Sequence, residues 1–202
     1  DGGDVDVYVD DGHIDFGQNG FDASGTDYFG VISRTLSVQG VVDGGAALDV
    51  IVGVNEVSLD TREVFVREAI GESPVVAIDA SELGALVSGR IHLISTEDGV
   101  GVHSQSDLYA TVGELSLDVN GDLILKDTYS QGDTVVQSAG TIEKTGESLA
   151  QGAVVIDSGG DVAISGVVMA QARVDVESDG AVVFQEEDGV GGSVFAEELS
   201  VK

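Results

Sequence analysis

The chain has 202 residues, of which 37 are Asp or Glu and 8 are Lys or Arg, so its net charge is −29. The absence of Cys excludes disulfides, thiolate metal sites and a cysteine nucleophile. The scarcity of basic residues excludes nucleic-acid binding through phosphate neutralisation. Because 42% of the residues are hydrophobic, the chain is not a disordered acidic tail. Its length suits one large domain or one elongated domain.

Short runs of alternating apolar residues predict β-strands from the start of the chain. Such runs lie at 5–9 and 48–52 in the first half. The segment 55–90 is less regular, and the alternating run 61–68 predicts a β-hairpin or an excursion with 75–78 as its return strand. A single helical turn is expected at 79–83, with Asp79 or Ser81 as its cap.

The second half repeats itself with a period of about 20 residues. The run from Val154 to Ile164 aligns with the run from Val174 to Phe184, and earlier copies begin at Thr134 and Leu115. Each copy contains a strand, a small turn with Gly, a second strand and a looser third side. The alignment ends near Val194, and Lys144 places a charge at an apolar position.

A fixed period of this length is typical of a solenoid rather than a sandwich. We therefore expect an all-β protein with a right-handed parallel β-helix fold and a small extra-helical hairpin or flap. Coils of 20 residues would give about ten coils and a rod on the order of 50 Å, since parallel strands lie about 4.8 Å apart. Aliphatic residues would fill a narrow core, and acidic residues would face outward.

The first half also carries a family resemblance. The runs that carry it are Ile32–Arg34, Ile51–Asn55, Val76–Asp79, Leu83–Ile91 and Thr96–Val102. In this order they resemble the filamentous-haemagglutinin-like exoproteins of two-partner secretion systems, a family of adhesins, haemolysins and stalks of contact-dependent growth inhibition. The residues of these motifs, expected to be structural, are Ser33, Arg34, Asn55, Asp79, Gly84, Gly89, Arg90, Glu97, Gly99 and Gly101.

The resemblance implies a domain organisation and a location. Residues 1–105 would form the end of a secretion domain, with an irregular insertion at about 55–90, and residues 106–202 a regular shaft of haemagglutinin repeats. The sequence Asp1–Asp4 lacks the features of a signal peptide, so we expect the chain to begin inside the secretion domain. The resemblance also implies secretion to the bacterial cell surface through an outer-membrane transporter, and a host or neighbouring-cell receptor or glycan as a further partner.

Candidate sites for chemistry are few. Charges at Arg34, Asp79 and Arg90 would need a partner inside a solenoid, so we expect a buried ion pair beneath the irregular segment. The three histidines, His13, His92 and His103, lack metal-ligand spacing and are expected to be structural or exposed. The runs 118–122 and 157–161 resemble fragments of calcium loops, but neither has the complete loop, so turns at coil corners are expected.

Two classes of function follow from these observations. The first is a structural shaft segment of an adhesin or haemagglutinin, or alternatively a delivery stalk of a growth-inhibition toxin, without catalysis, cofactor or metal. The second is a carbohydrate-active β-helix enzyme. The negative charge would repel the acidic polysaccharides that lyases of this fold act on, whereas paired carboxylates could still hydrolyse a neutral glycan.

Overall fold

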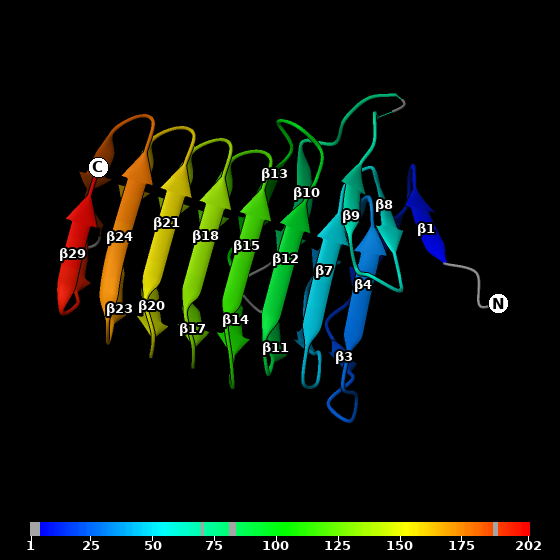
Figure 1. Cartoon of the computed structure of the whole chain (residues 1–202), viewed down its shortest axis with the longest axis horizontal. Coiled ribbons are helices and arrows are strands. Elements are labelled where there is room, and N and C mark those ends of the chain that lie inside the picture. The colour runs from blue at the N-terminus through cyan, green and yellow to red at the C-terminus, as the bar shows by residue number, and fades with distance from the viewer. Residues whose placement is uncertain (1–4, 70, 81–83, 188–189) are drawn as a thin grey trace.

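The computed structural model describes residues 5–69, 71–80, 84–187 and 190–202, and among these all regular structure is β. Three long parallel sheets of eight strands each form the faces of a solenoid (Figure 1). Each coil of the chain contributes one strand to each sheet in turn. The parallel β-solenoid expected from the repeats is therefore confirmed. No helix of the described residues is long and apolar enough to cross a membrane.

The three faces are named sheet 1, sheet 2 and sheet 3 in the order in which the chain visits them. Sheet 1 contains β2 (His13–Phe16), β5 (Thr35–Val38), β10 (Val76–Ala80), β13 (Gly101–Ser104), β16 (Leu123–Leu125), β19 (Ile142–Lys144), β22 (Val162–Ile164) and β25 (Val182–Phe184). Sheet 2 contains β3 (Phe21–Asp22), β6 (Val41–Asp43), β11 (Ala85–Ser88), β14 (Asp107–Ala110), β17 (Thr128–Ser130), β20 (Glu147–Ala150), β23 (Val167–Ala170) and β28 (Ser193–Phe195). Sheet 3 contains β4 (Phe29–Ser33), β7 (Leu48–Val52), β12 (Ile91–Ser95), β15 (Leu115–Val119), β18 (Thr134–Ser138), β21 (Val154–Ser158), β24 (Arg173–Ser178) and β29 (Glu198–Val201).

The strand register confirms the predicted repeat. In sheet 3, Leu115 pairs with Thr134, Thr134 with Val154, and Val154 with Val174. These are the positions that the 20-residue alignment placed together. Each sheet has eight strands, which corresponds to eight coils instead of the expected ten, because some residues lie outside the coils.

Most of those residues form an excursion near the N-terminal end. A separate antiparallel sheet contains β1 (Asp6–Val9), β8 (Asn55–Ser58) and β9 (Val64–Val66), in the order β1-β8-β9. An extra-helical hairpin is therefore present as expected, but its strands are β8 and β9. The expected return strand at 75–78 falls largely in β10, which returns the chain to the solenoid between β5 and β13. Residues 76–80 and 85–88 thus lie in regular strands, although the sequence placed them in the irregular segment.

One further expectation needs correction. Asp79 and Ala80 belong to β10 and not to a helical turn, and the remaining residues of that turn, 81–83, lie outside the described residues. The strands continue beyond the point near Val194 where the alignment ended, since β28 pairs with β23 and β29 with β24. The repeat is obscured there because a short antiparallel pair, β26 (Glu186–Glu187) with β27 (Val190–Gly191), lengthens that coil.

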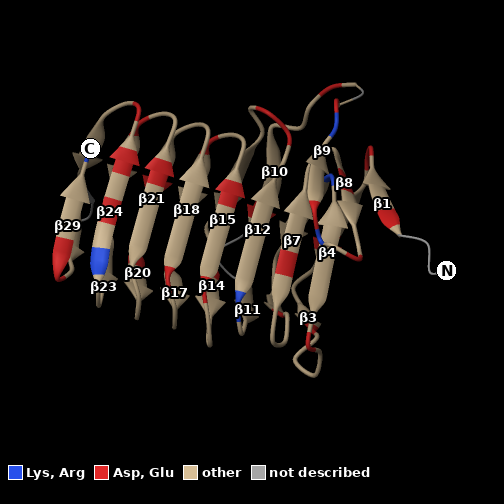
Figure 2. Cartoon of the chain, in the orientation of Figure 1, with Lys and Arg blue, Asp and Glu red and all other residues tan. Residues whose placement is uncertain are grey.

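Stacked aliphatic side chains fill the interior. One row in sheet 1 runs from Leu36 through Ile78, Val102, Leu123 and Ile142 to Val162, and every member is buried. Burial of each such side chain stabilises the fold by about 1.5–3 kcal/mol. On the outer surface, acidic residues recur at the ends of β15, β21 and β24 in sheet 3 (Figure 2).

Candidate functional site

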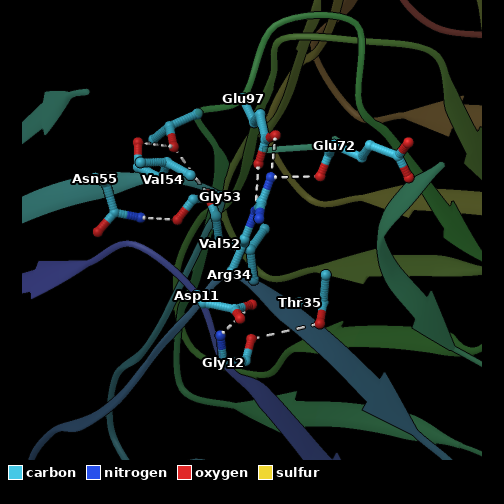
Figure 3. Close-up of polar contacts among 11 residues, drawn as sticks. Asp11, Gly12, Arg34, Thr35, Val52, Gly53, Val54, Asn55, Glu72 and Glu97 are labelled. Carbon is cyan, nitrogen blue, oxygen red and sulfur yellow. Dashed lines mark hydrogen bonds and ion pairs between the residues drawn. The ribbon is translucent and has the colours of Figure 1, made fainter. Parts of the chain in front are cut away.

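Two of the motif residues, Arg34 and Glu97, form a buried ion pair although they are 63 residues apart in the sequence (Figure 3). Arg34 follows β4 and Glu97 follows β12, so sheet 3 places both at the same corner. The Nη2 atom of Arg34 donates to Oε1 of Glu97 at 2.9 Å, and its Nε atom donates to Oε2 at 3.1 Å. Both residues are less than 10% exposed. This two-pronged geometry is the strongest form of a charged hydrogen bond.

The excursion closes over this pair. Arg34 Nη2 also donates to the backbone carbonyl of Glu72 at 3.0 Å, which ties the returning segment to the corner (Figure 3). The hydrogen bonds from Arg34 hold the pKa of the Glu97 carboxyl below its usual value, although burial acts in the opposite direction. The same bonds raise the pKa of Arg34. The pair is therefore charged on both sides and fixes the excursion to the solenoid.

The buried ion pair was expected, but its acidic partner was assigned wrongly. Asp79 is exposed on β10, and Arg90 is exposed after β11. Glu97 was recognised only as a motif residue. The 20-residue repeat could not predict that Glu97 pairs with Arg34, because the excursion lies between the two residues and interrupts that spacing.

Other motif residues shape the same corner. The Asn55 side chain is fully buried and its Nδ2 atom donates to the carbonyl of Gly53 at 2.8 Å, while its Oδ1 atom has no hydrogen-bond partner among the described residues. Gly53, which sequence reasoning did not single out, has φ of +98°, and a Cβ there would lie 2.5 Å from Thr96 Oγ1. Only glycine fits this position without displacing Thr96.

The remaining motif residues are spread over the neighbouring coils. The Ser33 hydroxyl donates to the carbonyl of Thr35 at 2.9 Å. Gly84 is buried beside β11, Gly99 has φ of +73°, and Gly101 packs against the next coil. A Cβ at Gly89 would lie 2.4 Å from the carbonyl oxygen of Ala46. Gly89 and Gly101 thus lie in close contact with the backbone of neighbouring coils.

A second polar feature lies between the hairpin and sheet 3. Arg62 and Arg90 line a groove of about 410 Å³ together with Asp49 and His92. The guanidinium carbon of Arg62 sits 4.1 Å from the ring centroid of Tyr28, a favourable cation–π distance. Burial and the neighbouring Asp49 raise the pKa of Tyr28. These contacts dock the hairpin on the sheet.

The runs 118–122 and 157–161, which resemble calcium loops, form hydrogen bonds between coils at the corners of the solenoid. Asp122 Oδ1 accepts a hydrogen bond from the backbone N–H of Thr141 at 2.8 Å, and Asp161 Oδ1 accepts one from Ala181 at 2.7 Å. Each carboxylate thus joins its coil to the next. The described residues contain no cluster of three His, Asp or Glu side chains arranged to hold a metal ion. The histidines also lie apart, with His92 in sheet 3 and His103 in sheet 1.

Lys144 places a charged side chain among the aliphatic residues of the core. Its side chain points inward from β19, is 2% exposed, and stacks between Leu125 and Ile164. Its Nζ atom donates to the backbone carbonyls of Lys126 and Thr145. Burial lowers the pKa of this amine to about 8.

Comparison with known proteins identifies the family. A family model described as the haemagglutinin repeat matches residues 50–127 and 113–178. The chain belongs to the haemagglutinin-repeat family. It is a shaft segment of a secreted, surface-exposed exoprotein of the filamentous haemagglutinin type.

Curated relatives and a solved structure agree with this assignment. The chain is 37% identical over 128 residues, or 63% of its length, to a tRNA nuclease CdiA of Escherichia coli strain STEC_O31. It is 33% identical over 58% of its length to the tRNA nuclease CdiA-2 of Burkholderia pseudomallei strain 1026b. In both cases it spans only 4% of the relative. The crystal structure of the filamentous hemagglutinin secretion domain superposes with a TM-score of 0.59 at 22% identity, covering 97% of this chain and 56% of that one, and supports the fold.

Proposed function

We propose that this solenoid is a spacer in the shaft of a large exoprotein, which leaves the cell through an outer-membrane transporter of the two-partner type. The supporting observation is the continuous strand pairing along the three parallel sheets, from β2 to β25 in sheet 1 and likewise in the other two. Such a stack can hold its two ends at a fixed separation, because every coil is hydrogen-bonded to its neighbours. Each coil contacts only adjacent coils, so length changes by whole repeats.

The composition supports export in an unfolded form. The chain contains no Cys and a single Pro, so neither disulfides nor slow isomerisation at many prolines would hinder threading and refolding. A repeat protein can then fold coil by coil as it emerges. The high negative charge would keep neighbouring shafts apart outside the cell.

The relatives favour a second, more specific role as the stalk of a growth-inhibition toxin. The two relatives compared above are both CdiA nucleases by name, and the match covers only a small part of each. If the role is a stalk, deletion of the gene in the producing strain should abolish inhibition of neighbouring cells in co-culture. A strain that loses attachment but keeps inhibition would instead indicate an adhesin.

We also propose that the segment performs no catalysis. Among the described residues, three of the eight cations are engaged in ion pairs, since Arg34, Arg67 and Arg173 pair with Glu97, Asp10 and Asp175. An anionic polysaccharide would meet a surface dominated by acidic residues. Release of reducing ends from neutral or acidic glycans by the purified chain would overturn this part of the proposal.

The spacer role is tested by changing the number of coils in the full-length exoprotein. Residues 134–153 make one complete coil, because Thr134 occupies the same register position as Val154. Insertion of five further copies should lengthen the shaft by about 24 Å at about 4.8 Å per coil, with export and protease resistance unchanged. Particle length in electron micrographs and surface exposure measure the two effects.

A matched control inserts five copies of residues 134–143, which are half of that coil. This insertion turns inward positions away from the core, so the exported protein should be scarce and sensitive to protease. Equal loss of export and folding in the whole-coil and half-coil proteins would contradict the spacer role.

A further inference from the structure

The outer surface of sheet 2 carries an apolar row that runs along the solenoid. In six successive strands, the central outward side chain is apolar or aromatic, and parallel pairing places these side chains in one row along the solenoid. The row, named the sheet 2 stripe, consists of Val87, Tyr109, Tyr129, Leu149, Met169 and Phe195. Its members are partly or largely exposed, with Tyr109 at 37% and Phe195 at 58%.

An outward row of sheet 3 differs from the stripe in composition. This row carries Asp118, Gln137, Asp157 and Glu177 in the same coils. Both rows point away from the core, so neither composition is needed to fill the interior. A contiguous exposed apolar surface on a soluble protein marks an interaction site more often than chance exposure.

Polar groups flank the stripe on both sides. Gln131, Gln151 and Gln171 each follow a stripe residue by two positions and form a row of amides. Across the stripe, Asp107, Asp127 and Glu147 form a row of carboxylates at the starts of the same strands.

The side chains of these rows contact one another and the stripe. The Tyr129 hydroxyl donates to Gln131 Oε1 at 2.9 Å, and the Tyr109 hydroxyl donates to Asp107 Oδ2 at 3.2 Å. Gln171 Nε2 donates to Gln151 Oε1. The surface therefore offers donors and acceptors on either side of an apolar centre.

The stripe contains both ring surfaces and a hollow. The rings of Tyr109 and Tyr129 lie 6.4 Å apart between centroids. Farther along, a depression of about 420 Å³ is lined by Leu149, Met169 and Phe195 and bordered by Gln171 and Glu197. The two features are continuous, because Tyr129 and Leu149 are register partners.

We propose that the sheet 2 stripe binds a neutral glycan chain that lies along the axis of the solenoid. Sugar rings have an apolar C–H face, which packs on aromatic and aliphatic side chains, and hydroxyl groups at their edges. The amide and carboxylate rows are placed to bond those hydroxyls. The coils repeat the arrangement every ~4.8 Å, so an extended polymer meets equivalent groups along its length.

The charge of the protein selects among possible occupants. The net charge of −29 and the carboxylate row repel an anionic glycan, an anionic membrane and a second copy of the chain. A neutral polymer avoids this repulsion and can still satisfy the polar rows. The proposal rests on the shaft being outside the cell, but its test uses the purified chain, so failure of binding would leave the spacer role intact.

Affinity electrophoresis tests the proposal with named polymers. The 202-residue chain would be run through native gels that contain hydroxyethyl cellulose, galactomannan, xyloglucan or dextran, and through gels that contain alginate or heparin. We expect retardation by at least one neutral polymer and none by the anionic polymers. Soluble oligosaccharides of the retarding polymer should quench tyrosine fluorescence, which is the main intrinsic signal because the chain has no Trp.

Paired variants show whether the stripe is the site. Replacement of both Tyr109 and Tyr129 with alanine should weaken binding by about tenfold or more, as expected for two lost aromatic contacts. The control, Ile124→Ala, removes a partly exposed apolar side chain of sheet 1 from the same part of the solenoid and should bind normally. Circular dichroism of each variant shows that the fold is retained.

Three results would overturn the proposal. The first is the absence of retardation in every neutral gel. The second is equal binding by the double tyrosine variant and the wild-type chain. The third is concentration-dependent dimerisation in analytical ultracentrifugation that the double variant abolishes, because a second copy would then be the occupant of the stripe.

Discussion

Replacing Lys144 with methionine should remove a pH dependence of stability that a single buried amine creates. The pKa of this amine is about 8 in the folded protein, against 10.5 for an ordinary lysine. Below pH 8 the amine is charged in both states, and burial of that charge costs the fold about 3 kcal/mol, since one pKa unit corresponds to about 1.4 kcal/mol. Above 10.5 both states are neutral and this cost is absent.

The sign follows from proton binding. Between pH 8 and 10.5 the unfolded chain holds more protons at this site than the folded chain, so the stability of the wild-type protein rises with pH relative to the variant. The inward stack of Leu125, Lys144 and Ile164 accepts methionine without a large change in volume. The variant should therefore be more stable near pH 7, with the difference shrinking by about 3 kcal/mol toward pH 10.5.

Urea unfolding followed by circular dichroism at pH 7, 8, 9 and 10.5 measures this difference. Comparison of the two proteins at each pH cancels the titration of groups that they share. Lys126→Met is the control, because Lys126 lies in the same part of the solenoid and its side chain is partly exposed. Parallel pH profiles for the wild type and the Lys144 variant would refute the reasoning.

Three further outcomes follow from the packing of the coils. Arg34→Met should destabilise the protein by about 3–5 kcal/mol because Glu97 is left buried without its partner, whereas the double replacement of Arg34 and Glu97 with methionine should recover much of this loss in the same urea assay. Gly166→Ala should destabilise the protein by about 3 kcal/mol through overpacking, since the new Cβ would lie 1.7 Å from the Gly146 carbonyl oxygen. The control Gly25→Ala has open space around it and should have little effect. Equal melting temperatures for the two variants would contradict this prediction. Calorimetric titration with calcium at moderate salt should give no saturable heat, and a stoichiometric transition would show that the corner carboxylates bind the ion.

The repeat could be predicted from the sequence because every coil of a solenoid packs against its neighbours in the same way. Val154 and Val174 occupy the same inward position, so similar residues recur at a fixed distance. Where residues are inserted outside a coil, the distance changes and the pattern is lost. This explains why the 20-residue alignment was lost near Val194, and why 76–80 and 85–88 were assigned to the irregular segment.

The motif in the first half could likewise be interpreted only in part from the sequence. Its charged members predicted a buried ion pair, because an unpaired charge inside a solenoid is too costly. The choice of Glu97 over Asp79 depended on which corner each residue reaches. That choice depends on how the excursion folds over the solenoid, which the alternating run 61–68 does not specify.

The sequence by itself therefore determined the β-solenoid, its coil length and the chemical character of its surface, because these depend on periodic burial and on composition. Only the tertiary structure decided that Arg34 meets Glu97 and that the outward apolar residues of sheet 2 form a single stripe. Each of these depends on lateral register between coils. Register brings together residues that are distant in the chain. Which residues meet depends on the lengths of all the turns and loops that lie between them.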